Sequence, residues 1–255
     1  KILQEGGNAV DAALASAFVM SVVKPEASGP GGDLFALVYM KKAGKVVALN
    51  SSGPAPAKAT ISYFQEHGLK SIPVNGPLSI AVPGAVDGWL ELHKKYGTIE
   101  LKRLVSDAVR IAREGFPISQ EFAESIEEHS KESSWVERFY RKPLGVSKPG
   151  KILGQRGLAA IFEKIADHGR SGFYSGEVAD QIVRTIRAEG GLLAQEDLQN
   201  IVAQWMEPLS STYRDTLVYE QPPVSQGFMV LEMLNIAEAW PFDSGSMSRA
   251  EMIHL

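Results

Sequence analysis

GGNAVDAALASAFVMSVVKPEASGPGGDLFALV, residues 6–38, is the stretch that decides the fold of this chain. Asn8 stands where a helix N-cap belongs, and apolar or small residues then recur at the spacing of a helix with one buried face. These residues are Val10, Ala13, Leu14, Ala17, Phe18, Ser21 and Val22. Pro25 ends the helix, because a proline inside a helix loses a hydrogen bond and clashes with the preceding turn. Residues 28–32 then predict a turn, and residues 34–39 predict a buried strand.

The rest of the chain alternates helices with a few short strands. Residues 45–50 predict a second strand, joined to the first by a turn at 41–44 as a hairpin. Further strands are expected at 79–82 and 217–219. Helices are expected at 61–66, at 85–113 with a break near 96–98, at 119–134 as a charged and solvated helix, and at 155–168, 177–189 and 226–240. Helices on either side of a few strands indicate an α+β layered architecture.

Length and composition bound the domain organisation. With 255 residues, of which 44% are hydrophobic, the chain suffices for one large domain or two small ones. Prolines and glycines loosen residues 142–154, which would suit either a linker or a loop. Helices dominate on both sides, so we favour a loop within a single domain over residues 1–255.

Charge and cysteine content exclude several classes of partner and chemistry. The net charge is −4 and acidic and basic residues are interspersed, so no basic stripe is available and nucleic acid is not an expected partner. The chain has no cysteine, which removes disulfides, thiolate metal sites and a cysteine nucleophile. The compartment stays open, with the cytoplasm slightly favoured over secretion or the periplasm.

The apolar stretch from residue 9 to residue 23 could be mistaken for a signal sequence or a membrane span. It contains Asp11, only Lys1 supplies a positive charge before it, and it is shorter than the ~18 apolar residues a span requires. We therefore expect a packed core helix and no membrane span.

These residues resemble the γ-glutamyltransferase family, whose members carry a GNAVDAA helix followed by a glycine-rich turn and a strand. Further motifs resemble the same family in the same order over nearly the whole chain. They are VPGAVDGW at 82–89, YGT at 96–98, AREGF at 112–116, GFYSG at 172–176, GGL at 190–192, EDL at 196–198, PPVSQG at 222–227 and MLNI at 233–236. So many motifs in register make chance similarity improbable.

The resemblance implies the αββα sandwich of the N-terminal-nucleophile hydrolases, with this chain as the helix-rich large-subunit part. In such relatives a precursor cleaves itself, and the new terminal threonine of the small subunit is the nucleophile while its amine is the base. The chain matches only the large-subunit side, so no catalytic residue is expected within it and alone it should be inert. The implied partners are a nucleophile-bearing small subunit and a small-molecule acyl amide. No cofactor is implied, and a dimer of heterodimers stays open.

The chain departs from the family in the loop after the second strand. Aligning Leu49 and Ala57 with the family places Ser52 where relatives carry an arginine that binds the α-carboxylate of the γ-glutamyl group, and Gly53 where they carry a glutamate. Serine cannot supply that charge. Residues 31–35, GGDLF, also look closer to cephalosporin-type acylases, which lack this arrangement. The substrate-binding candidates are therefore Ser51, Ser52 and Gly53, although serines in such a loop are more often turn formers.

Other chemistry-bearing residues have plainer explanations. The five histidines have no metal-like spacing, so no metal is expected. Asp33 is expected at the surface or as a cap, and the glycines at 29–32 suit either close packing of turn and helix or an approach to the active centre. Ser225 lacks a nucleophile elbow and is expected to be a loop residue.

Two functions of different kinds follow. The first is an enzyme, formed with a threonine-bearing partner, that hydrolyses or transfers a γ-glutamyl or related acyl group, with hydrolysis favoured because the arginine is missing. The second is a non-catalytic protein that kept the fold and binds an amide or peptide.

Overall fold

The computed structural model describes residues 1–131, 133–145 and 147–238. The chain forms two compact units, one of residues 1–33 with 53–202 and the other of residues 34–52 with those from Ala203 onward. The segment 142–154 lies inside the first unit. The expectation of a single large-subunit-like domain stays a prediction.

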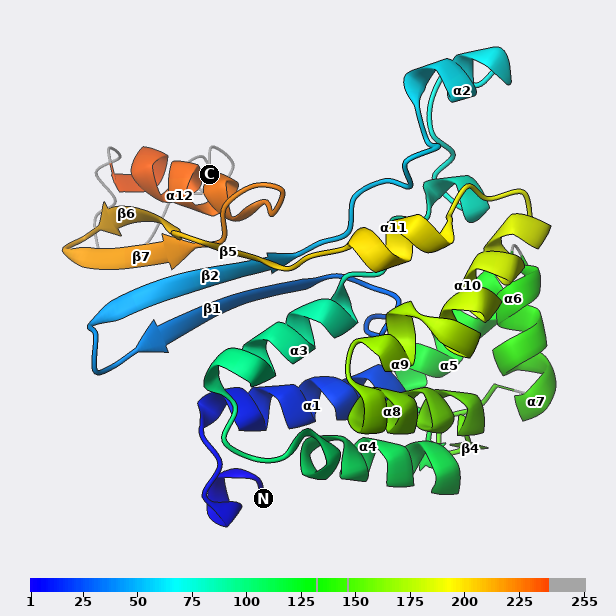
Figure 1. Cartoon of the computed structure of the whole chain (residues 1–255), viewed down its shortest axis with the longest axis horizontal. Coiled ribbons are helices and arrows are strands. Elements are labelled where there is room, and N and C mark those ends of the chain that lie inside the picture. Colours follow the sequence, from blue (N-terminus) through cyan, green and yellow to red (C-terminus); the bar gives the residue numbers. More distant parts are fainter. Residues whose placement is uncertain (132, 146, 239–255) are drawn as a thin grey trace, which may run out of the picture. The chain divides into compact units, whose positions relative to one another are not determined.

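The core of the first unit is a layer of helices around α1 (Ala9–Val23). Asn8 caps this helix as predicted, because its side chain accepts the N–H groups of Val10 and Asp11. The helix packs against α3 (Ala85–Tyr96) and α4 (Leu101–Glu114), and α4 packs against α8 (Arg156–His168) (Figure 1). The Phe18 ring lies 4.8 Å from that of Trp89 and 5.5 Å from that of Phe162, which joins three of these helices in one apolar core.

Further elements complete this unit. The helices are η1 (Leu3–Glu5), α2 (Ile61–Glu66), η2 (Pro77–Ser79), α5 (Gln120–His129), α6 (Ser134–Val136), η3 (Glu137–Arg141), α7 (Lys142–Leu144), α9 (Ser171–Tyr174), α10 (Gly176–Ala188) and α11 (Gln195–Asn200). The strands β3 (Phe116–Pro117) and β4 (Ile152–Leu153) form an antiparallel pair.

Two predictions in this unit need correction. Residues 79–82 do not form a strand: η2 ends at Ser79, and the segment after it is extended without a ladder, with the Val82 N–H bonded to the Pro54 carbonyl. The charged helix expected over 119–134 ends at His129, and one face of it is buried through Phe122, Ala123 and Ile126. The apolar residues in it recur at helical spacing, which charge content alone did not reveal.

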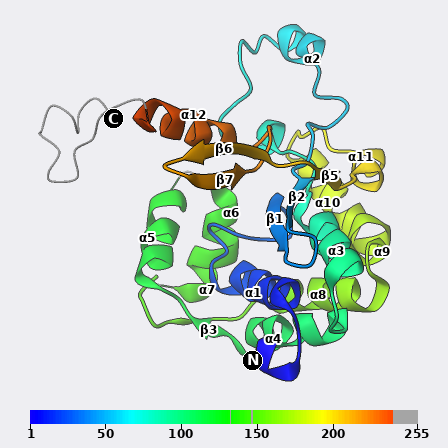
Figure 2. The ribbon, with the colours of Figure 1, turned by 90° about the vertical axis from the view of Figure 1, so that its left-hand side faces the viewer.

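The second unit contains a three-stranded antiparallel sheet in the order β1-β2-β5. The predicted hairpin is confirmed as β1 (Leu34–Met40) and β2 (Lys45–Ser51), and β5 (Gln204–Met206) pairs with β2. A second hairpin joins β6 (Leu209–Tyr213) to β7 (Thr216–Glu220), and α12 (Gly227–Glu238) lies along it (Figure 2). β7 contains the strand expected at 217–219. The expected end of α12, residues 239 and 240, lies outside the described residues.

The prediction that the first strand is buried is wrong for the part of the chain that the structure describes. β1 is an edge strand, and its side chains alternate between half-buried and exposed. Phe35, Leu37 and Tyr39 are 42%, 40% and 64% exposed. A continuous apolar run does not tell a strand covered on both faces from one covered on a single face.

No helix in residues 1–131, 133–145 or 147–238 is long and apolar enough to cross a membrane. The apolar stretch over residues 9–23 is instead α1, with Leu14, Phe18 and Val22 buried, as expected.

Candidate functional site

The glycine-rich turn after α1 is anchored on the N-terminus of α3. The carbonyl oxygen of Gly32 accepts hydrogen bonds from the N–H groups of Gly84, at 2.9 Å, and Ala85, at 2.8 Å. The first N–H groups of a helix have no partner within the helix, so the Gly32 carbonyl satisfies two of them. This contact fixes the turn against the start of the VPGAVDGW motif.

The glycines of this turn are not required by the described fold. A Cβ atom on Gly29 or Gly31 would meet no other atom within 4 Å, and one on Gly32 would meet only the Gly29 carbonyl oxygen, at 3.5 Å. None of the three has a left-handed φ angle. Close packing of turn and helix therefore does not explain these glycines within the described residues.

Gly53 occupies a position where no other residue fits. An ideal Cβ atom on Gly53 would lie 1.5 Å from the carbonyl oxygen of Val82. The two segments are held together because the Val82 N–H donates to the Pro54 carbonyl at 2.9 Å. The Gly53 N–H donates to Oδ1 of Asp33 at 3.1 Å, which agrees with the surface or capping role expected for that carboxylate.

The two serines before Gly53 belong to the end of the hairpin. Ser51 is the last residue of β2, pairs with Leu34 and is 1% exposed. The N–H of Ser52 donates to Oδ1 of Asn50 at 2.8 Å, so a side chain of β2 stabilises the turn. Ser52 is half-buried. A substrate-binding role for Ser51, Ser52 and Gly53 stays a prediction.

A buried polar cluster holds the segment that packs on Gly53. The Tyr174 hydroxyl donates to the Pro83 carbonyl at 2.9 Å and accepts the Asp87 N–H at 3.0 Å. Burial raises the pKa of the Tyr174 phenol, which therefore stays protonated and able to donate. Arg170 donates through Nε to Asp87 at 2.8 Å, and its guanidinium lies 4.8 Å from the Tyr174 ring centre. The cluster ties α9 to the start of α3.

Sequence reasoning missed these connections because their partners are far apart in the chain. Asp33 and Gly53 are 20 residues apart, and Asp87 and Arg170 are 83 apart. The one sequence feature that pointed to these contacts was the glycine in the loop at 51–56, because an isolated glycine can mark a close approach of two backbones.

The remaining candidates from the sequence are the histidines, considered as metal ligands, and Ser225. No group of three or more His, Cys, Asp or Glu residues that could hold a metal ion occurs among the described residues. Ser225 lies in the loop before α12, where its Oγ accepts the Gly227 N–H at 3.2 Å. That contact fits the loop role expected for Ser225.

Solved structures define the class of protein. The chain matches the γ-glutamyltranspeptidase of Helicobacter pylori with a TM-score of 0.91 and 32% identity, over 99% of this chain and 74% of that chain. It matches the cephalosporin acylase of Bacillus halodurans with a TM-score of 0.87 and 36% identity, over 96% of this chain and 47% of that chain. The predicted fold class, the αββα sandwich of the N-terminal-nucleophile hydrolases, is confirmed.

The family follows from the sequence. A family model for gamma-glutamyltranspeptidase matches residues 1–255, and this chain belongs to that family. It is 33% identical to the "glutathione hydrolase-like YwrD proenzyme" of Bacillus subtilis and 34% identical to the "glutathione hydrolase proenzyme" of Escherichia coli. Both alignments cover 100% of this chain but only 49% and 45% of the relatives. The chain therefore spans about half the length of these curated relatives.

Proposed function

We propose that this chain is the large-subunit part of an N-terminal-nucleophile amidohydrolase that acts on acyl amides, with the threonine nucleophile on a partner subunit. The Escherichia coli relative is named a proenzyme. A precursor that is cut into two subunits accounts for that name. In this proposal the described residues supply pocket walls and support, and the nucleophile and its base come from the other half.

The exposed apolar face of β1 is evidence for a partner subunit. Phe35, Leu37 and Tyr39 share one side of this edge strand and are all exposed. An apolar edge strand left open is a site for association. The glycines at 29, 31 and 32 support the same idea, because they leave open space where another backbone or a ligand could approach.

The lack of space at Gly53 is the main observation behind the proposed class of substrate. The Val82 carbonyl leaves no room for a side chain at position 53, where the family resemblance implies a glutamate. The preceding residue is Ser52, which has no charge where the resemblance implies an arginine. We infer that the enzyme binds an acyl group without the clamp on a γ-glutamyl α-carboxylate, and that it favours hydrolysis over transfer to an acceptor.

The first experiment identifies the subunits. Intact masses and N-terminal sequences of all polypeptides in the purified native protein are measured under denaturing conditions. A second polypeptide that begins with threonine is the expected result. A solitary, unprocessed polypeptide would contradict the proposal and favour the second function, a non-catalytic amide- or peptide-binding protein.

The second experiment tests the acyl group. Hydrolysis rates are compared for three anilides. The γ-glutamyl anilide carries a carboxylate and an ammonium group, the glutaryl anilide carries only the carboxylate, and the 4-aminobutyryl anilide carries only the ammonium group. We expect Ser52→Arg to raise kcat/KM for the two carboxylate-bearing anilides by about tenfold or more relative to 4-aminobutyryl anilide. Ser71→Arg adds the same charge at an exposed position and should leave the ratio unchanged. No rise with Ser52→Arg would remove position 52 from substrate selection.

A further inference from the structure

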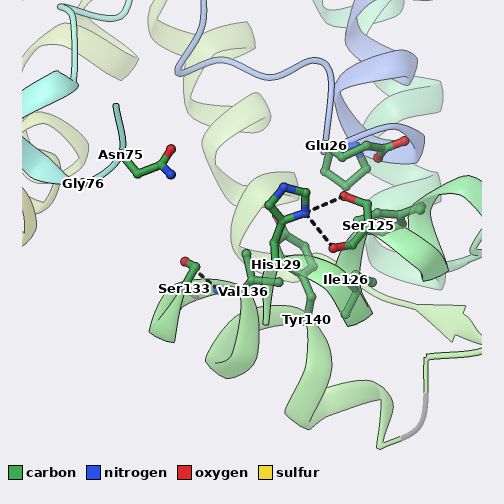
Figure 3. Close-up of a pocket in the computed structure, with 11 residues that line it drawn as sticks. Glu26, Asn75, Gly76, Ser125, Ile126, His129, Ser133, Val136 and Tyr140 are labelled. Carbon is green, nitrogen blue, oxygen red and sulfur yellow. Dashed lines mark hydrogen bonds between the residues drawn. The ribbon is translucent and has the colours of Figure 1, made fainter. Parts of the chain in front are cut away.

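The first unit contains a cavity of about 390 Å³ beside α5. The loop after α1 contributes Glu26, the loop before η2 contributes Asn75, α5 contributes Phe122, Ile126 and His129, and η3 contributes Tyr140 (Figure 3). A volume of this order is typical of sites for small organic ligands. The cavity therefore has the size, and walls from several segments, that a ligand site needs.

The floor of the cavity is apolar and aromatic. Phe122 and Ile126 are 2% and 1% exposed, and the Tyr140 ring meets the Phe122 ring edge-on with the centres 5.5 Å apart. Burial, and secondly the charge of Glu26, raises the pKa of the Tyr140 phenol. The phenol therefore stays neutral, and aromatic rings of this kind attract cations.

Glu26 places a poorly compensated negative charge at this cavity. Its side chain is 14% exposed, and its one recorded ion pair in the described part of the chain is with Lys24, at 3.8 Å. Lys24 is engaged more closely by Glu121, at 2.7 Å. A carboxylate whose recorded cation is this distant is suited to accept a closer one from a ligand.

His129 adds a second polar side chain to the cavity wall. Its Nδ1 donates to the Ser125 carbonyl oxygen at 2.9 Å, because a carbonyl can only accept (Figure 3). This contact leaves Nε2 as the ring nitrogen for a ligand. A neutral imidazole that donates from Nδ1 accepts at Nε2, which suits a ligand that donates N–H groups.

We propose that this cavity binds a small organic amine. Its ammonium group pairs with the Glu26 carboxylate and lies near the Tyr140 ring, and its apolar body packs on Phe122 and Ile126. An anionic ligand would be repelled by Glu26, and a neutral ligand would leave that carboxylate without a close cation. The inference goes beyond the proposed function, because it involves neither the acyl amide nor the nucleophile.

The test uses benzylamine as the probe and benzyl alcohol as its neutral counterpart. Each is titrated into the purified native protein by isothermal titration calorimetry. We expect saturable binding of benzylamine and at least tenfold weaker binding of benzyl alcohol. Equal binding of the two compounds, or no binding of benzylamine at millimolar concentration, would overturn the proposal, and this comparison does not depend on any variant.

Two variants locate the site. Glu26→Gln removes the cavity carboxylate and should weaken benzylamine binding about tenfold or more. Glu128→Gln removes an exposed carboxylate of α5 that does not line the cavity, and it should leave the affinity within about twofold. Thermal unfolding of both variants establishes that they are folded. Equal affinities of the two variants would show that benzylamine binds elsewhere and would overturn the assignment.

Discussion

The carbonyl oxygen of Val82 lies 1.5 Å from the point where a Cβ atom on Gly53 would stand. Real Cβ atoms do not approach an oxygen this closely, so any other residue at position 53 must displace the backbone. Val82 also donates its N–H to the Pro54 carbonyl, which fixes the two segments at this separation. The glutamate that the family resemblance implies at position 53 is therefore excluded by the local backbone.

Gly53→Ala should lower the free energy of unfolding by about 1–3 kcal/mol, because the new methyl group overlaps the Val82 backbone. Gly157→Ala is the matched control: its Cβ atom would meet nothing within 4 Å, so the change should not lower the free energy of unfolding. Urea denaturation of the native protein measures both. Equal stability of the two variants would mean that the contact between Gly53 and Val82 is relaxed in solution.

Asp33 should stabilise the loop at Gly53 through one hydrogen bond. Asp33→Ala removes the oxygen that accepts the Gly53 N–H at 3.1 Å and should cost about 0.5–1.5 kcal/mol. Asp33→Asn keeps a side-chain oxygen in the same place and should retain most of that stability. Denaturation midpoints compare the two. A larger loss with asparagine than with alanine would contradict the hydrogen-bond role.

Asp11 should make the free energy of unfolding depend on pH in the acidic range. Its buried carboxylate accepts hydrogen bonds from the Thr98 N–H at 2.9 Å, the Thr98 hydroxyl at 2.5 Å and the Ile99 N–H at 3.2 Å. Burial alone would raise the pKa of Asp11, but the hydrogen bonds, first that from the Thr98 hydroxyl, hold it below the ordinary value. The stabilisation is therefore present above an unfolded-state pKa of about 4 and is lost as the pH falls through the lower folded-state pKa.

The measurement is urea denaturation between about pH 7 and about pH 3, with Asp11→Asn beside the native protein. The variant should be less stable by about 1–3 kcal/mol at neutral pH, and the difference should shrink in acid. Glu66→Gln removes an exposed carboxylate and should change neither the stability at neutral pH nor its dependence on pH. A difference between Asp11→Asn and the native protein that does not vary with pH would refute the account.

Tyr174 should be needed to hold the segment that packs on Gly53. Tyr174→Phe removes the hydroxyl and leaves the buried Pro83 carbonyl and Asp87 N–H without it, which should cost about 1–3 kcal/mol. Tyr63→Phe is the control, because the Tyr63 ring lies on the surface helix α2. Thermal unfolding of both variants provides the comparison, and a smaller loss for Tyr174→Phe than for Tyr63→Phe would contradict this role.

A substitution at Leu37 tests whether the partner subunit of the proposed function covers β1. Leu37→Lys places a charge on the exposed apolar face of β1 and should reduce recovery of the second subunit several-fold when the native protein is purified. Ile61→Lys places the same charge on α2, at a residue that is 78% exposed, and should have no such effect. Undiminished recovery with Leu37→Lys would mean that the partner does not cover β1.

The sequence predicted the elements whose pattern is local and strong. The Asn8 cap, the apolar spacing of α1, the break between α3 and α4 and the first hairpin all depend on neighbouring residues, and all are confirmed. β5 was missed because a strand of three residues offers little periodicity, and β6 was missed because its sequence, LSSTY, is mostly polar. Asp11 was interpreted only as an interruption of an apolar stretch, because its partners at Thr98 and Ile99 lie 87 and 88 residues away.

The sequence by itself determined the family and the absence of an arginine at position 52, because both depend on which residues stand in which order. Only the tertiary structure decided that position 53 must be glycine, that the glycines at 29, 31 and 32 are not required by packing, and that β1 exposes an apolar face. Each of these depends on backbones and side chains brought together from distant parts of the chain. Distances and free space of that kind arise from folding, and no local pattern of residue types encodes them.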